Sequence, residues 1–451
     1  MPEKKVEVPV IRNHRAIKAA TALFTAAALM LPGCGRKALP SAQVTELRSR
    51  SEAAGFLAEK GEENKGFIAG SDQRDKASDY AYLYDNALTA VVLSSAGAKE
   101  QAEMIADAIV FAQEHDRTYR DGRLRNAYIA GDPRSDSGRS IAAGKVTVRL
   151  PGFWQNGEWQ EDSYTVSTST GNMAWTILAL CAVAGKASSE KQSEYLTAAM
   201  KAADFVLTLE SEHKRGGFTA GYEGWDRAQT KIPYASTEHN IDLYAAFSVL
   251  SESVSGINAA KAGDYRKAAE EAKRFVFSMY DEKLGCFYTG TTDDGETVSD
   301  RVIPLDTGSL SVLVFGEDLE DPYKTLSFAE NRMAVGGGFD FSDGDLDGIW
   351  NEGTAQMAVC YHKLENTEKY DAVMTYLKTQ TAGDGSMPAA DRDGVSTGFV
   401  IDGTDTLWEF NNVQSISATA WLALAQLGQS PFDFALSEGP YEKEPADQTK
   451  E

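Results

Sequence analysis

One pattern recurs six times along the chain and limits what it can fold into. A charged amphipathic segment ends, and a glycine follows, with a large apolar residue directly after it or within two positions. Glycine readily closes a helix in the left-handed conformation, and the apolar residue then packs back on the last turn. We therefore expect each of these glycines to end an amphipathic helix with one solvated face. They are Gly66, Gly122, Gly217, Gly285, Gly338 and Gly385.

After each glycine comes a loop of variable length and then a second kind of helix, rich in small apolar residues. These segments start at Asp85, Thr170, Ser236, Asp306, Asn351 and Gln414. Six apolar helices alternating with six amphipathic ones predict an all-α (α/α)6 toroid of six helical hairpins, with the apolar helices inside. Residues 41–60 would supply the sixth outer helix and close the ring against the pair that starts at Gln414. An open solenoid is disfavoured, because the inner helices start at irregular intervals of 45 to 85 residues.

The one strand-like stretch is residues 145–166, which we interpret as a small β-hairpin insertion that turns at Asn156-Gly157.

The N-terminus is typical of an export signal. Five Lys and Arg residues precede an apolar run from Ala19 to Leu31, which is too short for the roughly 20 residues of a membrane span. The run ends in "LPGCG", which resembles the lipobox of bacterial lipoproteins. That resemblance implies cleavage before Cys34, acylation of this cysteine and a lipid-anchored protein of the bacterial cell envelope, on the periplasmic or extracellular side of a membrane. A plain secretory signal is the alternative. We divide the chain into a signal peptide (1–33), a linker (34–42), a barrel (43–432) and an acidic tail (433–451).

The charge excludes some partners. The formal net charge is −23, and about −26 without residues 1–33, which disfavours binding to nucleic acid or anionic lipid. Three cysteines remain after Cys34, and their spacing suits neither a disulfide framework nor a metal site. Cys181 and Cys360 are expected in the core. We expect a monomer.

Acidic residues gather where the loops enter the inner helices. They are Asp85, Glu238, Asp242, Asp306 and Glu352. Small residues beside them, Gly171, Gly308 and Gly353, would let the first turns converge. Aromatic residues occupy the same edge, and we expect several to bind substrate: Tyr84, Trp154, Trp225, Tyr234, Trp350 and Trp408.

Acids and aromatic platforms together suit carbohydrate chemistry, because sugar rings stack on aromatic faces and two carboxyl groups break a glycosidic bond. The alternation of helices, the "GGF" turns, "STEHN" and "WNEGTAQ" resemble the six-hairpin glycosidase superfamily over residues 41–432. The resemblance implies an (α/α)6 barrel with its active site at the wide mouth. Most members are inverting glycoside hydrolases, and polysaccharide lyases and sugar epimerases are minorities.

We predict Glu238 and Glu352 as the main acid/base pair and leave open which one donates the proton. Asp85 and Asp306 are the next catalytic candidates, although an aspartate at a helix start is also an ordinary cap. His239 would bind a sugar hydroxyl or serve the structure. Asp343, Asp345 and Asp347 have the spacing of the first half of a calcium loop, but Thr354 stands where that loop has its last acid. The alternative is a solvated acidic loop, and no other cofactor is expected.

The function expected is a membrane-anchored glycoside hydrolase acting on a neutral or weakly charged poly- or oligosaccharide. Two alternatives remain open. One is a non-catalytic glycan-binding lipoprotein of a polysaccharide export or uptake system. The other is a lyase or epimerase on the same barrel, for which Arg123, Arg125, Arg227 and Arg301 would supply cations.

Overall fold

The computed structural model describes residues 41–70, 79–142, 144–401 and 405–436. The predicted signal peptide, Cys34 and most of the linker lie outside the described residues, as do residues 437–451 of the predicted tail. None of the helices in the described ranges combines the length and the apolar character that a membrane span requires.

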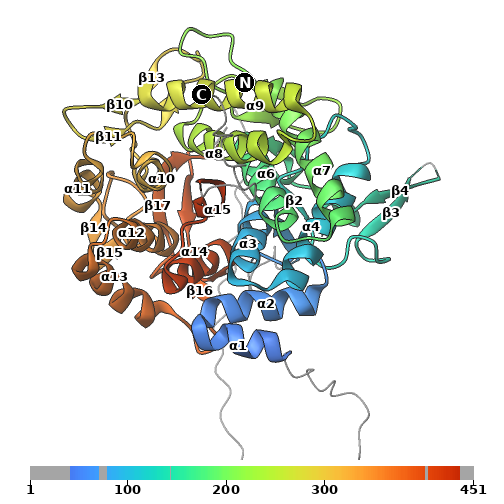
Figure 1. The fold of residues 1–451 in the computed structure, drawn as a ribbon, viewed down its shortest axis with the longest axis horizontal. Coiled ribbons are helices and arrows are strands. Elements are labelled where there is room, and N and C mark those ends of the chain that lie inside the picture. Colours follow the sequence, from blue (N-terminus) through green and yellow to red (C-terminus); the bar gives the residue numbers. More distant parts are fainter. Residues whose placement is uncertain (1–40, 71–78, 143, 402–404, 437–451) are drawn as a thin grey trace, which may run out of the picture. The chain divides into compact units, whose positions relative to one another are not determined.

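Helices in two rings form the fold, as Figure 1 shows. The inner helices are α3 (Leu83–Ala96), α6 (Thr170–Ala184), α8 (Thr237–Val254), α10 (Leu305–Phe315), α12 (Asn351–Lys363) and α14 (Ile416–Leu427). The outer helices are α2 (Glu52–Asn64), α4 (Lys99–Glu114), α7 (Ser189–Leu207), α9 (Ala259–Ser278), α11 (Pro322–Arg332) and α13 (Thr367–Gln380). Three further helices are α1 (Ala42–Arg50), α5 (Ser163–Val166) and α15 (Asp433–Leu436).

The inner ring closes on itself. Each inner helix packs on the next, in the order α3, α6, α8, α10, α12 and α14, and α14 packs back on α3 and α2. The predicted (α/α)6 toroid is therefore confirmed. The segment expected to supply the sixth outer helix contains two helices, α1 and α2, which meet at Ser51, and α2 makes the contact with α14.

Burial explains why the inner helices are poor in charge. Every residue of α6 except Asn172 is buried, and so is every residue of α12 from Asn351 to Tyr361. A helix that is surrounded on all sides has no solvated face for charged side chains. Cys181 and Cys360 are buried free thiols of this core, as predicted, and Cys286 is a third.

Short antiparallel strands form the loops. They pair as β1 (Tyr80–Tyr82) with β2 (Ala127–Ile129), β3 (Arg139–Ala142) with β4 (Lys145–Val148), β5 (Phe153–Gln155) with β6 (Glu158–Gln160), β10 (Tyr280–Asp281) with β11 (Cys286–Phe287), β12 (Gly290–Thr291) with β13 (Val298–Ser299), β14 (Ala334–Val335) with β15 (Gly338–Phe339), β16 (Met387–Pro388) with β19 (Gln414–Ser415), and β17 (Val395–Val400) with β18 (Leu407–Phe410). A three-stranded sheet joins β7 (Thr168–Ser169), β8 (Gly221–Glu223) and β9 (Thr230–Ile232).

The recurring glycines lie in these loops and do not cap helices directly. The outer helix α9 ends at Ser278, for example, and Gly285 (φ 75°) turns the hairpin of β10 and β11 that follows. The apolar residue after each glycine is buried as predicted, but an inner helix holds it. Thr354 in α12 bonds both backbone groups of Phe339, and Asn240 in α8 does the same for Phe218. The repeat therefore couples each outer helix to the next inner one.

Two boundaries differ from those predicted. The turn at Asn156-Gly157 forms as expected, with φ of 53° and 82°, but it joins β5 to β6. The stretch from residue 145 instead begins with β4, which pairs back with β3. The predicted tail began at residue 433, whereas residues 433–436 form α15 and pack against α6 and α8.

Candidate active site

Carboxyl groups from four inner helices meet at the N-terminal end of the ring. The first turns of α3, α8, α10 and α12 contribute Asp85, Glu238, Asp306 and Glu352, and α8 adds Asp242 one turn after Glu238. Asp85, Asp242, Asp306 and Glu352 are buried, and Glu238 is half-buried. In the described part of the chain, no lysine or arginine forms an ion pair with them.

Two of the three predicted glycines permit this convergence, whereas a Cβ on Gly308 would meet only the Thr325 side chain, at 3.4 Å. A Cβ on Gly171 in α6 would lie 2.5 Å from the His239 ring, and a Cβ on Gly353 in α12 would lie 2.2 Å from the Trp350 ring. Both distances are far below van der Waals contact. Only glycine therefore lets these first turns approach their neighbours.

Glu352 is held by hydrogen-bond donors. The Tyr84 hydroxyl donates to Glu352 Oε1 at 2.7 Å, and the Trp421 indole donates to the Tyr84 oxygen at 3.0 Å. Burial raises the pKa of Glu352, and the hydrogen bonds from Tyr84 and Ser417 counteract part of that increase because they stabilise the carboxylate. Glu352 is thus the acid whose ionised form is best supported.

Glu238 has the opposite surroundings. Burial first, and then the negative charges of Asp306, Asp242 and Glu352, hold its pKa well above the usual range. Hydrogen bonds do not offset the charge of Asp242, because neither of its carboxylate oxygens has a hydrogen-bond partner of good geometry. Like charges near a carboxyl group favour its protonated form. Two acids with opposed environments are what an acid/base pair requires.

Asp306 and Asp85 belong to the same cluster. Burial and then the charge of Glu352 raise the pKa of Asp306 to about 7, and the same two causes hold that of Asp85 well above normal. Hydrogen bonds from the backbone amides of Thr307 and Asp306 offset part of this increase for Asp306, while its Oδ1 atom is buried without a partner.

A cavity of about 290 Å3 opens beside three of these acids, and Asp306 and Glu352 are not among its lining residues. Its lining includes Asp85, Glu238, Asp242 and His239, together with Tyr82, Tyr84, Asn126, Tyr164, Asn172 and Trp175. Burial lowers the pKa of His239 to about 4, so its imidazole is neutral at physiological pH. A larger hollow of about 670 Å3 lies at the other end of the inner helices, beside His362 and Gly428, far from the cluster of acids.

The predicted aromatic platforms divide into several groups. Tyr84 lines the cavity. Trp408 is 47% exposed on β18 and packs at 6.2 Å, ring centre to ring centre, against Tyr164 of the cavity wall. Trp350 is only 4% exposed and packs against Phe341 and Phe410, so it cannot offer a face to a sugar.

Two other predicted platforms lie away from the cavity lining. Trp225 is half-exposed in the loop between β8 and β9, and Tyr234 is exposed two residues after β9 ends. Trp154 lies on β5 opposite Trp159. Neither Trp225 nor Tyr234 is among the residues that line the described cavity.

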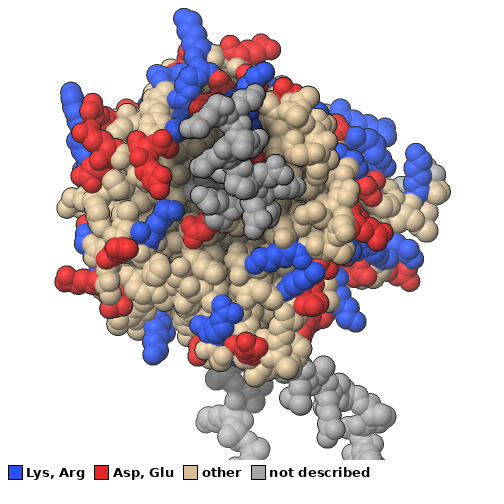
Figure 2. Space-filling view, in the orientation of Figure 1, with Lys and Arg blue, Asp and Glu red and all other residues tan. Residues whose placement is uncertain are grey.

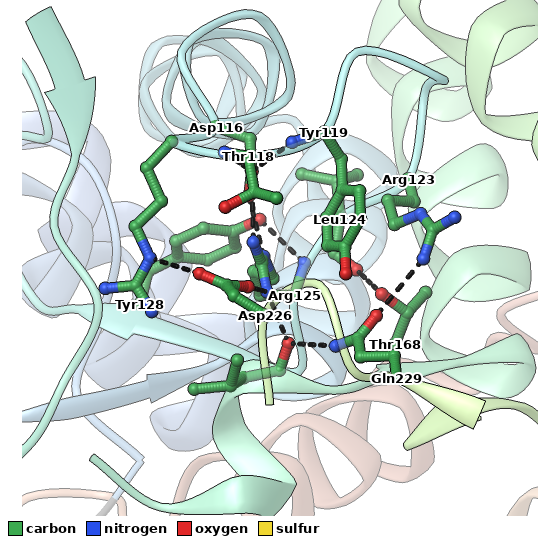
Figure 3. A network of polar contacts seen from close by, with 12 residues as sticks. Asp116, Thr118, Tyr119, Arg123, Leu124, Arg125, Tyr128, Thr168, Asp226 and Gln229 are labelled. Atoms are coloured by element: carbon green, nitrogen blue, oxygen red, sulfur yellow. Dashed lines mark hydrogen bonds and ion pairs between the residues drawn. The ribbon is translucent and has the colours of Figure 1, made fainter. Parts of the chain in front are cut away.

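Two of the four arginines considered for a lyase, Arg123 and Arg125, are engaged elsewhere, whereas Arg227 and Arg301 are exposed. Arg125 is fully buried and binds Asp116 through Nε at 2.7 Å and Asp226 through Nη1 at 2.5 Å, as Figure 3 shows. Burial alone would raise the pKa of Asp116, but the hydrogen bonds and charge of Arg125 hold it below the usual value. Arg123 pairs with Asp121. This network braces the loop that carries Asn126 into the cavity wall.

In the loop predicted to bind calcium, the three carboxylates that lie together are not the three that were predicted. Asp345 and Asp347 lie together with Asp340, and one carboxylate oxygen of each falls within 4.8 Å of the others. Asp343 instead accepts a hydrogen bond from the Ile303 amide and pairs with Arg332.

Sequence reasoning placed Asp242 among the acids at the inner helix starts without giving it a role, and it passed over Tyr164 and Asn172. Asp242 carries a usable signal, since it follows Glu238 by four positions and so shares its helix face. Asn172 is the only residue of α6 that is not buried, an exception visible once the helix is known to be internal. Tyr164 stands in the four-residue helix α5, and no pattern in the sequence places it beside the cavity.

Similar solved structures share this architecture. One is a glycosidase variant in complex with glucose, with 13% identity, a TM-score of 0.57, and coverage of 87% of this chain and 99% of that chain. Another is an α-amylase from Clostridium perfringens, with 11% identity, a TM-score of 0.54 and coverage of 85% and 99%. A third is a sugar epimerase from a ruminal bacterium, with 13% identity, a TM-score of 0.55 and coverage of 85% and 98%.

No protein-family model matches the sequence, and no curated protein sequence matches it. At these low identities, the structural likeness shows the fold, and function has to be argued from the site.

Proposed function

We propose that this chain is a glycoside hydrolase in which Glu238 is the general acid and Glu352 the general base. The observation that carries the proposal is the contrast between the two carboxyl groups. Burial and neighbouring like charges raise the pKa of Glu238 well above the usual range, whereas Glu352 receives hydrogen bonds that favour its ionised form. The glycosidase and α-amylase of similar fold support this reading.

In the proposed reaction, Glu238 protonates the leaving oxygen of the glycosidic bond. Glu352 removes a proton from a water molecule, which attacks the anomeric carbon from the opposite face. We infer inversion, because α10 lies between α8 and α12 in the ring and keeps the two acids on non-adjacent helices. Inverting enzymes need about 6.5–9.5 Å between their carboxyl groups, to leave room for the water.

The substrate proposed is a neutral glycan. The cluster of acids has no cationic partner among the described residues, so uronic or sulfated sugars would meet uncompensated repulsion there. Figure 2 shows basic and acidic side chains interspersed on the face it displays, without a continuous basic patch that would attract an anionic polymer.

The location proposed is the outer side of a bacterial membrane. The basic lead, the apolar run from Ala19 to Leu31 and Cys34 support export and lipid attachment there. Mass spectrometry of the mature protein tests this directly, because a diacylglycerol-modified N-terminal Cys34 is expected and an unmodified N-terminus contradicts it. We further propose that the protein acts as a monomer.

An epimerase is the second candidate, because a neutral histidine, His239, lines the cavity with an unpartnered Nδ1 atom. Removing a proton next to a carbonyl works best with a base whose pKa lies near 7. Burial lowers the pKa of His239 to about 4, which makes it a weak base. The carboxyl pair therefore favours hydrolysis.

The test compares Glu238→Gln and Glu352→Gln on a panel of neutral polysaccharides and oligosaccharides, with the product anomer followed by NMR. Glu368→Gln is the matched control, because Glu368 is also the second residue of a helix but lies exposed on the outer helix α13. We expect each site variant to lose at least about a thousandfold in kcat, while the control keeps its activity. Full turnover by both site variants would refute the assignment.

A second measurement separates the two roles. A glycosyl fluoride needs no protonation of its leaving group, so Glu238→Gln should retain much more activity on it than on a polysaccharide, whereas Glu352→Gln should not. The reverse pattern would exchange the roles. Glycan binding without turnover by the parent protein would favour a binding lipoprotein, and isomerised sugar without cleavage would favour an epimerase.

A further inference from the structure

The loop from Asp340 to Gly348 holds a group of carboxylates outside the active site. One ligand oxygen from each of Asp340, Asp345 and Asp347 lies within 4.8 Å of the other two. Like charges at this separation repel one another strongly unless something neutralises them. We therefore expect a positively charged partner to neutralise this group.

Asp340 shows that the protein itself does not supply that partner. Its side chain is 0% exposed, and its Oδ1 atom accepts a hydrogen bond from the Phe341 amide at 2.7 Å. Its Oδ2 atom is buried and has no hydrogen-bond partner. A buried, unpaired carboxylate oxygen is costly. Its position is nevertheless fixed, since the Asp340 amide donates to the Met333 carbonyl at 2.8 Å.

The nearby arginines form ion pairs with other carboxylates. Arg392 pairs with Asp391 at 2.7 Å, and Arg332 pairs with Asp343. Asp347 receives the Ser396 amide on its two oxygens, at 3.3 and 3.1 Å, which orients the carboxylate without neutralising it. Two clustered carboxylates, Asp340 and Asp347, are thus held in place by the fold, and the third, Asp345, approaches from the exposed side.

We propose that Asp340, Asp345 and Asp347 bind a calcium ion. The donors are all carboxylate oxygens, without histidine or cysteine, which suits a hard cation. Calcium accepts irregular loops with mixed carboxylate, carbonyl and water ligands, whereas magnesium demands near-octahedral geometry and sheds its waters reluctantly.

The site would position the two acid-bearing helix starts next to it. Ser342 forms a β-bridge with Pro304, and the Leu305 amide donates to the Phe341 carbonyl at 2.8 Å, one residue before Asp306. In the other direction, the loop passes from Asp347 into α12, which carries Glu352. A cation in this loop would therefore tie together the starts of α10 and α12.

The test is calcium binding to metal-free mature protein, measured by calorimetry and by the rise in Tm, in the absence of any glycan. Terbium luminescence gives an independent signal, because Trp350 stands three residues beyond Asp347 and can sensitise the ion. We expect Asp340→Asn and Asp345→Asn to weaken calcium binding by at least about tenfold. Asp345 is exposed, so its variant remains informative if Asp340→Asn does not fold.

Asp343→Asn is the matched control within the same loop, because Asp343 is committed to Arg332 and the Ile303 amide. It should bind calcium as the parent does. The proposal is overturned if the parent binds no calcium, or if Asp343→Asn loses binding while Asp340→Asn and Asp345→Asn keep it. Since no readout uses substrate, the outcome is independent of whether the chain cleaves glycans.

Discussion

Replacing Asp306 with asparagine should change how the stability of this protein depends on pH. Asp306 is 6% exposed, and burial followed by the charge of Glu352 raises its pKa from 3.8 to about 7. An acid whose pKa is higher in the folded state binds its proton more tightly there than in the unfolded chain. Its contribution is therefore most favourable below pH 3.8, and it is lost progressively as the pH rises to 7.

The size of the effect follows from those two pKa values. Proton linkage between 3.8 and about 7 gives a destabilisation of about 2 kcal/mol at pH 5 and about 4 kcal/mol at pH 8. The parent should thus lose about 2–3 kcal/mol between these pH values through this group, and Asp306→Asn should not. Because the Asp306 charge also raises the pKa of Glu238, its removal acts in the same direction there.

The assay is calorimetric unfolding of both proteins at pH 5 and pH 8 and equal ionic strength. For a domain of this size, an entropy of unfolding of roughly 0.8 kcal/mol per kelvin makes 2–3 kcal/mol equivalent to about 3 °C. The Tm of Asp306→Asn minus that of the parent should therefore be about 3 °C larger at pH 8 than at pH 5.

Asp294→Asn is the control for this assay. Hydrogen bonds from the side chain and backbone of Thr297 hold the pKa of Asp294 below its usual value. Asp294 is therefore ionised at both pH values, and its variant should show a Tm difference that does not change with pH. Equal Tm differences at pH 5 and pH 8 for Asp306→Asn would refute the reasoning on the buried cluster.

Three further substitutions test the scaffold. Tyr84→Phe removes the hydrogen bond to Glu352, so the acidic limb of the kcat/KM profile should move to higher pH; an unmoved limb would contradict the role of the Glu352 carboxylate. Gly353→Ala places a Cβ 2.2 Å from the Trp350 ring and should cost about 1–3 kcal/mol in urea unfolding, where parental stability would contradict the close approach. Arg125→Met leaves Asp116 and Asp226 without their buried cation and should cost about 3–5 kcal/mol; a neutral result would show that the network is dispensable.

The repeating part of the fold could be predicted from the sequence. Helices that are buried all round exclude charge, and this fixes the positions of Thr170 and Asn351 as helix starts. The six recurring glycines predicted the correct number of helical hairpins, but they do not end helices as expected. Gly285 turns a hairpin, and what holds the apolar residue after such a glycine is a side chain such as Asn240, remote in sequence. Pairings of this kind leave no local pattern.

The site was predictable in kind and less so in detail. Acids at inner helix starts must converge once the ring closes, so Glu238 and Glu352 could be named. Their different environments come from contacts between distant helices, such as the Tyr84 hydrogen bond to Glu352. An aromatic residue beside an acid does not reveal which way its ring faces. Trp350 is for this reason a core residue rather than a sugar platform.

The closure of α14 on α2 and α3 also has a consequence for biogenesis. The hydrogen bond from Trp421 to Tyr84 joins residues 337 positions apart. Contacts over such long stretches form slowly. During translation, α3 is synthesised early. Tyr84 then lacks its hydrogen bond from Trp421 until α14, the last inner helix, has been synthesised. A truncated product lacking α14 should thus resemble an open, chaperone-dependent intermediate and not a smaller version of the finished toroid.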